Sequence, residues 1–366
     1  MGFELILLVV LVALVFEFIN GFHDTANSIA TVVATKVLSP RQAIALAAIT
    51  NLLGALWGTA VAKTISSGLV DTKVVTQEVI GIALFAGIVW NLLTWYWGLP
   101  SSSTHAMVGG LTGAALAASH DNWSVIIWSK PAADHWWKGG GMLWKIVVPM
   151  FTSPVLGLLL GFLIMGALYF LLRNWRPHWV NSVFGRMQIV SSAAMGFMHG
   201  SNDAQKTMGI IALALVAGTT AGAFDNAPEW MGFLKTTIPE GSKGPEIALW
   251  IKVVCAIIMC AGTAVGGWRI IKTLGHKMVK LHPVHGFAAE TASATMILIA
   301  TKLGIPVSTT HNITAAVMGV GASKRLNAVK WSVVERIVWA WILTIPVSGG
   351  LAYLLVRALQ VVDVIK

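Results

Sequence analysis

Charged residues are scarce in this 366-residue sequence: Asp, Glu, Lys and Arg make up 11% of its residues, while 56% are hydrophobic. Soluble domains carry about 25% charged residues, so this chain has too few charged side chains to cover a globular surface in water. The same scarcity excludes a disordered chain, because disordered segments are polar and charged. Long apolar runs separated by short charged clusters instead predict an all-α polytopic membrane protein.

Other chemistries lack their usual residues as well. The two cysteines, Cys255 and Cys260, lie in one apolar stretch, a spacing that fits neither a disulfide framework nor a zinc site. A Gly-Lys-Ser/Thr phosphate-binding loop does not occur, so ATP is not expected to power the protein. The first residues lack the basic start of a signal peptide, and we expect them to form a membrane helix of the mature protein.

The net charge of +10 is better explained by membrane topology than by a nucleic-acid partner, which we do not expect. Cytoplasmic loops of membrane proteins are enriched in Lys and Arg. If the N-terminus lies outside and the two halves are inverted, the inner loops carry almost only basic residues and the outer charges balance. The sequence therefore predicts a multi-pass protein of the cell inner membrane with both termini periplasmic. The Trp-rich segment 122–144 is predicted to be an outer loop.

Four hydrophobic stretches are shorter than the roughly 20 residues that cross a bilayer, and each follows or overlaps a polar segment. The short stretches are 26–38, 104–118, 204–218 and 307–322, and the polar segments are 20–27, 99–105, 199–206 and 304–311. Backbone without hydrogen bonds is not tolerated against lipid. We therefore expect broken helices or re-entrant half-helices that line a cavity.

The two halves of the chain repeat each other. Residues 21–24 match residues 200–203, residues 99–105 match residues 305–311, and the Thr-Ser-Pro-Val and Thr-Ile-Pro-Val segments at 152–155 and 344–347 give a weaker third match. The matches follow the same order in each half, which indicates duplication. We predict two inverted-topology repeats, residues 1–175 and 186–366, joined by a cytoplasmic linker at 176–185, with their half-helices meeting at the midplane.

Once the predicted loops are set aside, four acids remain at membrane depth: Glu17, Asp24, Asp203 and Glu290. Ionisable groups inside a membrane are costly and are functional candidates by default, although an interhelical ion pair is the plain alternative. Asp24, Asp203, Gln205 and Glu290 are predicted to bind a coupling cation or carry a proton. Asp24, Asp203 and His23 are also candidate metal ligands. Histidines 23, 105, 199 and 311 all lie in the polar segments, where structural hydrogen bonding is the alternative to ligation.

The matching loops at 99–105 and 305–311 each place hydroxyl residues at the start of a half-helix. Such residues cap free N–H groups, and two helix N-termini that converge at midplane would form a cage for a tetrahedral oxyanion. Plain capping explains one such loop well but explains the symmetric pair poorly. The predicted anion-binding residues are Ser102, Ser103, Thr104, Ser308, Thr309, Thr310, Asn27, Asn202 and Lys206.

At these residues the sequence resembles the inorganic phosphate transporter (PiT) family. The duplicated signature is carried by residues 20–27 (Asn-Gly-Phe-His-Asp-Thr-Ala-Asn) and 199–206 (His-Gly-Ser-Asn-Asp-Ala-Gln-Lys), together with the two loops and residues 286–290. The resemblance covers nearly the whole chain. It implies a homodimeric secondary transporter in the lipid bilayer that imports inorganic phosphate by alternating access.

The first signature looks like that of the bacterial low-affinity members, which resemble proton symporters that take up a neutral complex of phosphate with Mg²⁺ or another divalent metal. His23 departs from the pattern of the sodium-driven relatives. The resemblance therefore favours H⁺ over Na⁺ as the co-transported ion, and no resident cofactor is expected.

Several alternatives stay open at this point. The chain could be a sodium-coupled phosphate symporter, or a permease for sulfate or another oxyanion on the same scaffold. A membrane metalloenzyme built on His23, Asp24, His199 and Asp203 is disfavoured, because a catalytic site seldom needs two equivalent half-sites, and we expect no enzyme activity. An anion channel is disfavoured by the buried carboxylates.

Overall fold

The computed structural model describes residues 3–71, 75–130, 139–225, 227–240, 242 and 244–363. Within these ranges the regular structure is helical, with two isolated β-bridges in the loops. The α-helices are α1 (Phe3–Ala34), α2 (Pro40–Ala55), α3 (Ala60–Ser67), α4 (Gln77–Trp97), α5 (Ser103–Ala118), α6 (Val148–Leu171), α7 (Pro177–Thr220), α8 (Leu249–Val265), α9 (Trp268–Lys272), α10 (Pro283–Lys302), α11 (Thr309–Lys324) and α12 (Trp331–Val361). Short 3₁₀ and π segments are η1 (Trp123–Val125), η3 (Leu143–Val147), η4 (Glu229–Leu234), η5 (Thr273–Lys277) and η6 (Leu326–Ala328).

Four segments are long and apolar enough to cross a membrane: α1, α4, η3 with α6, and α12. Two bent helix pairs meet the same criterion when the helices of each pair are taken together: α2 meets α3 at 68° and α8 meets α9 at 59°. Each bend contains a glycine with positive φ, Gly58 at 81° and Gly266 at 77°, a conformation that a residue without Cβ adopts at little cost. The prediction of an all-α membrane protein is confirmed.

The two predicted breaks that contain proline are present. α4 ends at Gly98 and α10 is followed by Gly304, both with positive φ. A short non-helical segment then leads to Ser102 and Ser308, whose hydroxyls accept hydrogen bonds from the backbone N–H groups of His105 and His311 (3.2 Å each). The hydroxyl residues therefore start α5 and α11 as helix caps.

The other two predicted breaks were wrong. Residues 20–27 lie inside α1, and residues 199–206 lie inside the 44-residue α7. Both segments are polar, but helical backbone satisfies its own hydrogen bonds wherever it runs, so polar side chains facing a protein interior require no interruption. The linker predicted at 176–185 is also helical from Pro177 onward, while the division into two repeats stays a prediction.

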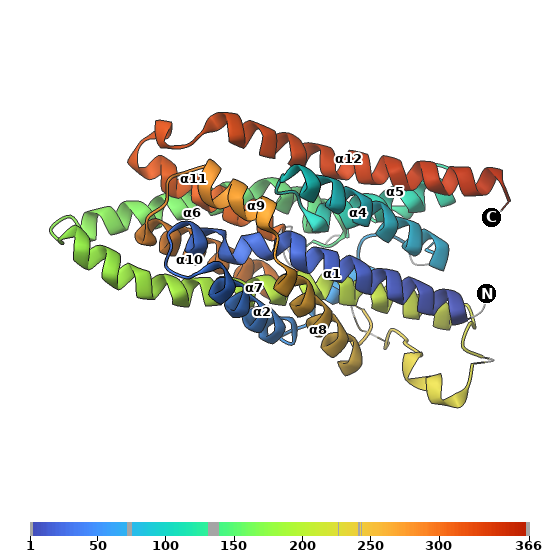
Figure 1. Ribbon diagram of the computed structural model, residues 1–366. Coiled ribbons are helices and arrows are strands. Elements are labelled where there is room, and N and C mark those ends of the chain that lie inside the picture. The colour runs from blue at the N-terminus through green and yellow to red at the C-terminus, as the bar shows by residue number, and fades with distance from the viewer. Residues whose placement is uncertain are drawn as a thin grey trace.

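Helices from the two halves of the chain interlock. α6 packs along α11, and α12 packs along α5 (Figure 1). Glycines allow this approach: a Cβ on Gly113 of α5 would lie 2.0 Å from the carbonyl oxygen of Gly349, and one on Gly319 of α11 would lie 2.0 Å from that of Leu158. These contacts agree with the close helix packing that glycine-rich stretches give in membranes.

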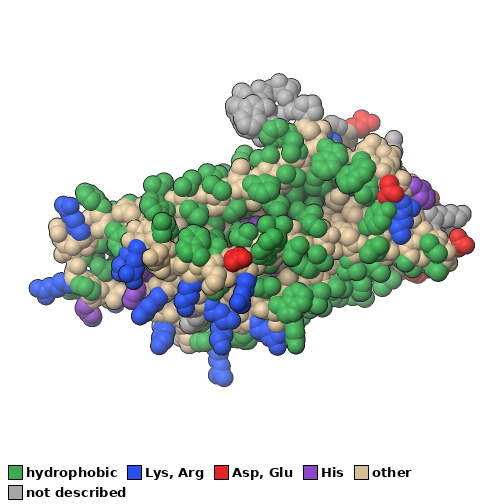
Figure 2. All heavy atoms as spheres, turned by 90° about the horizontal axis from the view of Figure 1, so that it is seen from above, with side chains coloured by type: hydrophobic (Ala, Val, Ile, Leu, Met, Phe, Trp, Pro, Cys, Tyr) green, Lys and Arg blue, Asp and Glu red, His purple; other side chains and the backbone are tan. Residues whose placement is uncertain are grey.

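Both termini lie at the same end of the molecule (Figure 1). We call this the terminal end. On the face shown in Figure 2, Lys and Arg gather toward the other end, while acidic side chains gather at the terminal end. This distribution agrees with the predicted positive-inside arrangement, although which end faces the cytoplasm stays a prediction. Of the predicted outer loop 122–144, residues 131–138 lie outside the described residues; Trp123 and Trp128 are exposed, with stacked rings.

Candidate functional site

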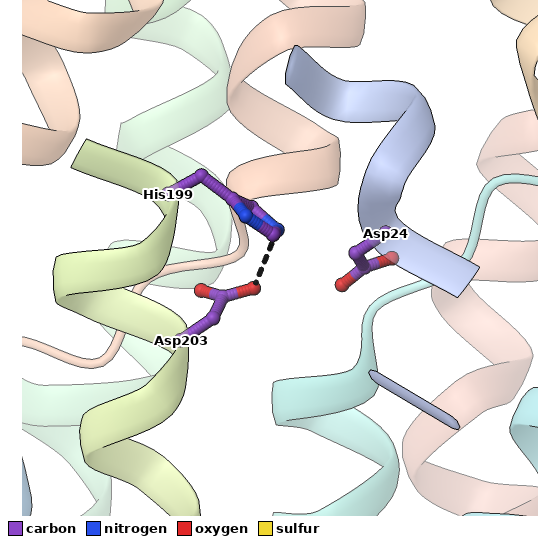
Figure 3. A group of neighbouring side chains, drawn as sticks. All are labelled: Asp24, His199 and Asp203. Carbon is purple, nitrogen blue, oxygen red and sulfur yellow. Dashed lines mark ion pairs between the residues drawn. The ribbon is translucent and has the colours of Figure 1, made fainter. Parts of the chain in front are cut away.

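The two signature segments meet at the centre of the bundle, where α1 and α7 cross. Asp24 on α1 faces His199 and Asp203, which project from successive turns of α7 (Figure 3). One ligand atom from each of these three residues lies within 4.8 Å of the others, and all three side chains are buried. Burying two carboxylates together is costly unless each is paired or hydrogen-bonded, so their partners define the site.

Asp24 is held by both half-helices. The hydroxyl of Ser103, at the start of α5, donates to Asp24 Oδ2 (2.9 Å), and that of Thr310, at the start of α11, donates to Oδ1 (3.2 Å). On α1 itself, His23 Nδ1 lies 2.7 Å from Asp24 Oδ1. The other ring nitrogen of His23 lies 3.2 Å from the hydroxyl oxygen of Thr94 on α4, so the imidazole links Asp24 to that helix.

Asp203 has a cation beside it. Lys206 Nζ donates to Asp203 Oδ1 (2.5 Å) and to the carbonyl oxygen of Val307 (2.9 Å). The hydroxyl of Thr309 donates to Asp203 Oδ2 (3.0 Å), and His199 Nε2 lies 3.3 Å from the same oxygen. The lysine neutralises this carboxylate and ties α7 to the loop that precedes α11.

Asn27 connects the two carboxylates through α11. Its side-chain amide donates to the hydroxyl oxygens of Thr309 (3.2 Å) and Thr310 (2.9 Å). These hydroxyls in turn donate to Asp203 and Asp24. Among the described residues, the Asn27 Oδ1 atom is buried without a hydrogen-bond partner. An amide oxygen of this kind suits a cation.

The structure brings five of the nine predicted anion-binding residues to the two aspartates: Ser103, Thr309, Thr310, Asn27 and Lys206. The other four lie around this centre in supporting positions. Ser102 and Ser308 cap their helices, and the Thr104 hydroxyl donates to the carbonyl of Val307 (3.4 Å). The amide of Asn202 donates to Thr301 Oγ1 (2.9 Å) and to the carbonyl of Ile305 (3.3 Å).

Two of the predicted cation-coupling residues lie away from the aspartates. Gln205 accepts from the backbone N–H of Val61 (2.8 Å) and donates to the carbonyl of Trp57 (3.2 Å), so it stabilises the α2–α3 bend. Glu290 on α10 accepts hydrogen bonds from Thr31 (2.5 Å) and Gln188 (3.3 Å). Its second oxygen accepts from the hydroxyl of Ser191.

Along the axis of α1, the two buried glutamates lie on opposite sides of Asp24: Glu17 is on α1 itself, and Glu290 is on α10 beside Thr31 of α1. Glu17 is two turns before Asp24, and Thr31, the partner of Glu290, is two turns after it. Glu17 accepts from the hydroxyl of Thr207 on α7 (2.5 Å). Gln188 and Ser191 were not predicted from the sequence as partners of Glu290. Their spacing of three on a helix could have indicated them, because such residues share one face.

Histidines divide into two groups. His199 joins the carboxylates, one of the two outcomes that the sequence left open for it, and its spacing of four from Asp203 places both on one helix face. His105 and His311 instead face each other, with ring centroids 4.9 Å apart, and His311 stacks on Trp341. This second pair stands apart from the group of Asp24, His199 and Asp203.

This arrangement, with paired buried carboxylates between two hydroxyl-capped helix N-termini inside an apolar bundle, is that of a membrane transporter. Residues 20–352 match the model of the Phosphate transporter family. The chain belongs to the phosphate transporter family, as its signature predicted, and so to a family of transporters and not of enzymes.

Relatives of known description agree over the full length. The chain is 40% identical to a "Probable low-affinity inorganic phosphate transporter" of Bacillus subtilis, over 96% of this chain and 97% of the relative. It is 41% identical to a protein of the same description from Rhizobium meliloti, over 95% of each. A solved structure titled "The sodium-dependent phosphate transporter" shares 25% identity and superimposes with a TM-score of 0.79, over 98% of this chain and 99% of that one.

Proposed function

We propose that this protein imports inorganic phosphate across the cell inner membrane by cation symport, as a homodimer working by alternating access. The family, the description of its relatives and the buried donor set support this proposal. The carrying observation is that the Thr309 and Thr310 hydroxyls, at one helix N-terminus, bind the two carboxylates of the two signature segments.

Coupling follows from competition for these hydroxyl donors. Ser103 and Thr310 both donate hydrogen bonds to Asp24. A proton or metal cation on Asp24 would release these hydroxyls, and the freed donors and helix N-termini then suit an oxyanion. The anion and the cation therefore bind better together than apart, which is the requirement for symport.

Phosphate fits this site better than sulfate. At neutral pH phosphate carries a proton and can donate a hydrogen bond to a nearby carboxylate, whereas sulfate can only accept. Asp24 and Asp203 lie where such a donor would find an acceptor. Competition between sulfate and labelled phosphate in uptake tests this choice, and sulfate that inhibits as strongly as unlabelled phosphate would contradict it.

We favour a proton over sodium as the coupling ion. Lys206 already neutralises Asp203, which leaves Asp24 as the carboxylate that needs a cation during transport. Sodium coupling is the second candidate, because the superimposed solved structure is titled sodium-dependent. Phosphate would travel as the free anion or with Mg²⁺ or another divalent metal.

Uptake by proteoliposomes tests the proposal, with pH and sodium gradients imposed separately. Asp203→Asn should lower phosphate uptake by about 100-fold or more, because it leaves the Lys206 ammonium buried without its partner, at a cost of about 3–5 kcal/mol. Asp24→Asn should abolish coupled uptake, because an amide carries no charge for the coupling cation. Asp225→Asn, on the exposed α7–α8 loop, is the matched control and should transport normally. Normal uptake by correctly inserted Asp24→Asn and Asp203→Asn proteins would refute the assignment.

A further inference from the structure

We propose that a lysine-lined cavity at the terminal end is a second anion-binding site, a vestibule that collects phosphate before it reaches the buried aspartates. The cavity has a volume of about 620 Å³, within the usual range of small-molecule sites. It lies between α3, the segment preceding α6 and the end of α10. The proposal rests on phosphate being the transported substrate.

Four lysines line the vestibule: Lys63, Lys130, Lys145 and Lys302. Hydroxyls of Thr64, Ser67 and Ser242 also border it, and none of the described residues that line it is acidic. The ammonium groups of Lys63, Lys130 and Lys302 repel each other around this cavity. A small anion with several acceptor oxygens, such as phosphate, relieves that repulsion and accepts hydrogen bonds from ammonium and hydroxyl groups alike.

Backbone carbonyls position two of the lysines. Lys130 Nζ donates to the carbonyl of Ser67 (3.3 Å), and Lys145 Nζ donates to the carbonyl of Leu303 (3.0 Å). An ammonium group carries three N–H donors, so at Lys130 such a bond fixes the position of the side chain while leaving donors for a ligand. These lysines are held at the cavity and do not simply extend into water.

One short segment separates the vestibule from the transport site. On the cavity side, the carbonyls of Leu303 and Gly304 accept from Lys145 and from the Thr64 hydroxyl (2.7 Å). On the inner side, the carbonyl of Val307 accepts from Lys206, the partner of Asp203. Leu303 and Val307 are four residues apart, a reach of at most about 14 Å. An anion in the vestibule is therefore one loop away from the transport site.

The charge of the vestibule distinguishes between two forms of the substrate, the free phosphate anion and a neutral metal–phosphate complex. A positive cavity raises the local concentration of a free anion and offers nothing to a neutral complex of phosphate with a divalent metal. At the approach to the transport site, the vestibule therefore favours the free anion over a neutral complex. Screening by salt should weaken the effect, because the lysines are partly exposed.

The double variant Lys63→Gln/Lys302→Gln tests the vestibule. In cells that lack other phosphate importers, its KM for phosphate uptake at low ionic strength should rise about tenfold, because charge focusing changes association by at least that factor. Its maximal rate should stay near that of the wild type. The control Lys235→Gln/Lys252→Gln removes the same charge from the α7–α8 loop and the start of α8, outside the cavity, and should leave KM unchanged.

Two conditions extend this test. Raised ionic strength, and Mg²⁺ in excess over phosphate, should each bring the KM values of variant and wild type together. Equal KM values for the variant, its control and the wild type at low ionic strength would overturn the vestibule. A wild type that accumulates no phosphate would instead overturn the proposed function, so the two failures are distinguishable.

The phosphate group of a lipid is the other source of the same chemistry. Proteoliposomes of pure phosphatidylcholine and of phosphatidylcholine with anionic phosphatidylglycerol separate the two. A vestibule for inorganic phosphate predicts the KM difference in both membranes. A difference seen only with phosphatidylglycerol would assign the lysines to lipid and overturn their role in collecting the substrate.

Discussion

Asp24 and Asp203 occupy equivalent places in the two signatures, but their surroundings differ in charge. Where the first signature has Asn27, the second has Lys206. Asn27 donates to hydroxyls of α11, whereas Lys206 binds Asp203 and a backbone carbonyl directly. A carboxylate oxygen and a carbonyl oxygen are the ligands that hard cations prefer. The lysine ammonium therefore occupies, as a tethered cation, the position at which the second half-site could bind a free one.

Replacing this lysine should make phosphate uptake depend on a free cation. In Lys206→Asn, Asp203 would be left as a buried carboxylate without its partner, which costs about 3–5 kcal/mol. Phosphate uptake without sodium should therefore fall by about 100-fold or more. Sodium should restore part of the activity, because the new amide oxygen adds a third ligand beside Asp203 and Val307. The measurement is uptake against sodium concentration.

Lys206→Met is the matched variant, since it removes the charge and supplies no hard ligand. Its uptake should stay low at every sodium concentration. The tethered-cation interpretation fails if Lys206→Asn and Lys206→Met respond to sodium in the same way.

Sequence alone could identify most of these residues but not the direction in which each side chain points. Polar residues within apolar runs marked several side chains that meet at the centre of the bundle, because membrane interiors rarely tolerate such residues without partners. Gln205 was predicted to bind the coupling cation together with Asp203, yet residues two apart do not face each other on a helix. The spacings of three and four to Lys206 and His199 are the ones that meet. The partners of Glu290 needed the structure, since they come from α1 and α7.

At the scale of elements, the four polar segments had different outcomes for a reason that is visible in their residues. The segment at 99–105 directly follows Gly98 and the segment at 304–311 begins with Gly304, both glycines with positive φ. Each segment also contains a proline, Pro100 or Pro306. Proline lacks the N–H that a helix needs, and glycine favours the left-handed helix end. The segments at 20–27 and 199–206 contain no proline, and α1 and α7 continue through them. Polarity locates a site, whereas proline and glycine locate a break.

The contact between α5 and α12 depends on the absence of a side chain at Gly113. In Gly113→Ala, the new Cβ would lie 2.0 Å from the Gly349 carbonyl oxygen, so the two helices must separate. Overpacking of this kind costs about 1–3 kcal/mol, and we expect a lower Tm for the protein in detergent, measured by thermal unfolding.

Gly350 supplies the matched control. It lies on α12 next to Gly349, and a Cβ there meets nothing within 4 Å. Alanine has a higher helix propensity than glycine by about 1 kcal/mol, so Gly350→Ala should keep or raise the Tm. Equal shifts in both variants would show that the close approach of α5 and α12 contributes nothing to stability.

For the whole molecule, the sequence predicts a duplication, but it does not predict how the two halves pack against each other. Matching segments identify two similar halves, yet nothing in them tells whether each half folds on itself. In the structure α6 of the first half lies along α11 of the second, and α12 lies along α5. The proposed transport site is likewise shared, since Thr310 from the second half donates a hydrogen bond to Asp24 from the first. The two halves form one site and one bundle.

The orientation of this bundle is the remaining prediction at this scale, and the vestibule depends on it. Basic residues gather away from the terminal end (Figure 2), so that end should face the periplasm. In intact cells, a membrane-impermeant thiol reagent should modify Asp363→Cys, near the C-terminus, and should leave Asn174→Cys, in the α6–α7 turn, unmodified until the membrane is permeabilised. The wild type, whose Cys255 is buried and whose Cys260 lies within α8, measures the background. The reverse pattern would place the lysine vestibule on the cytoplasmic side, where it would collect phosphate for export and not for import.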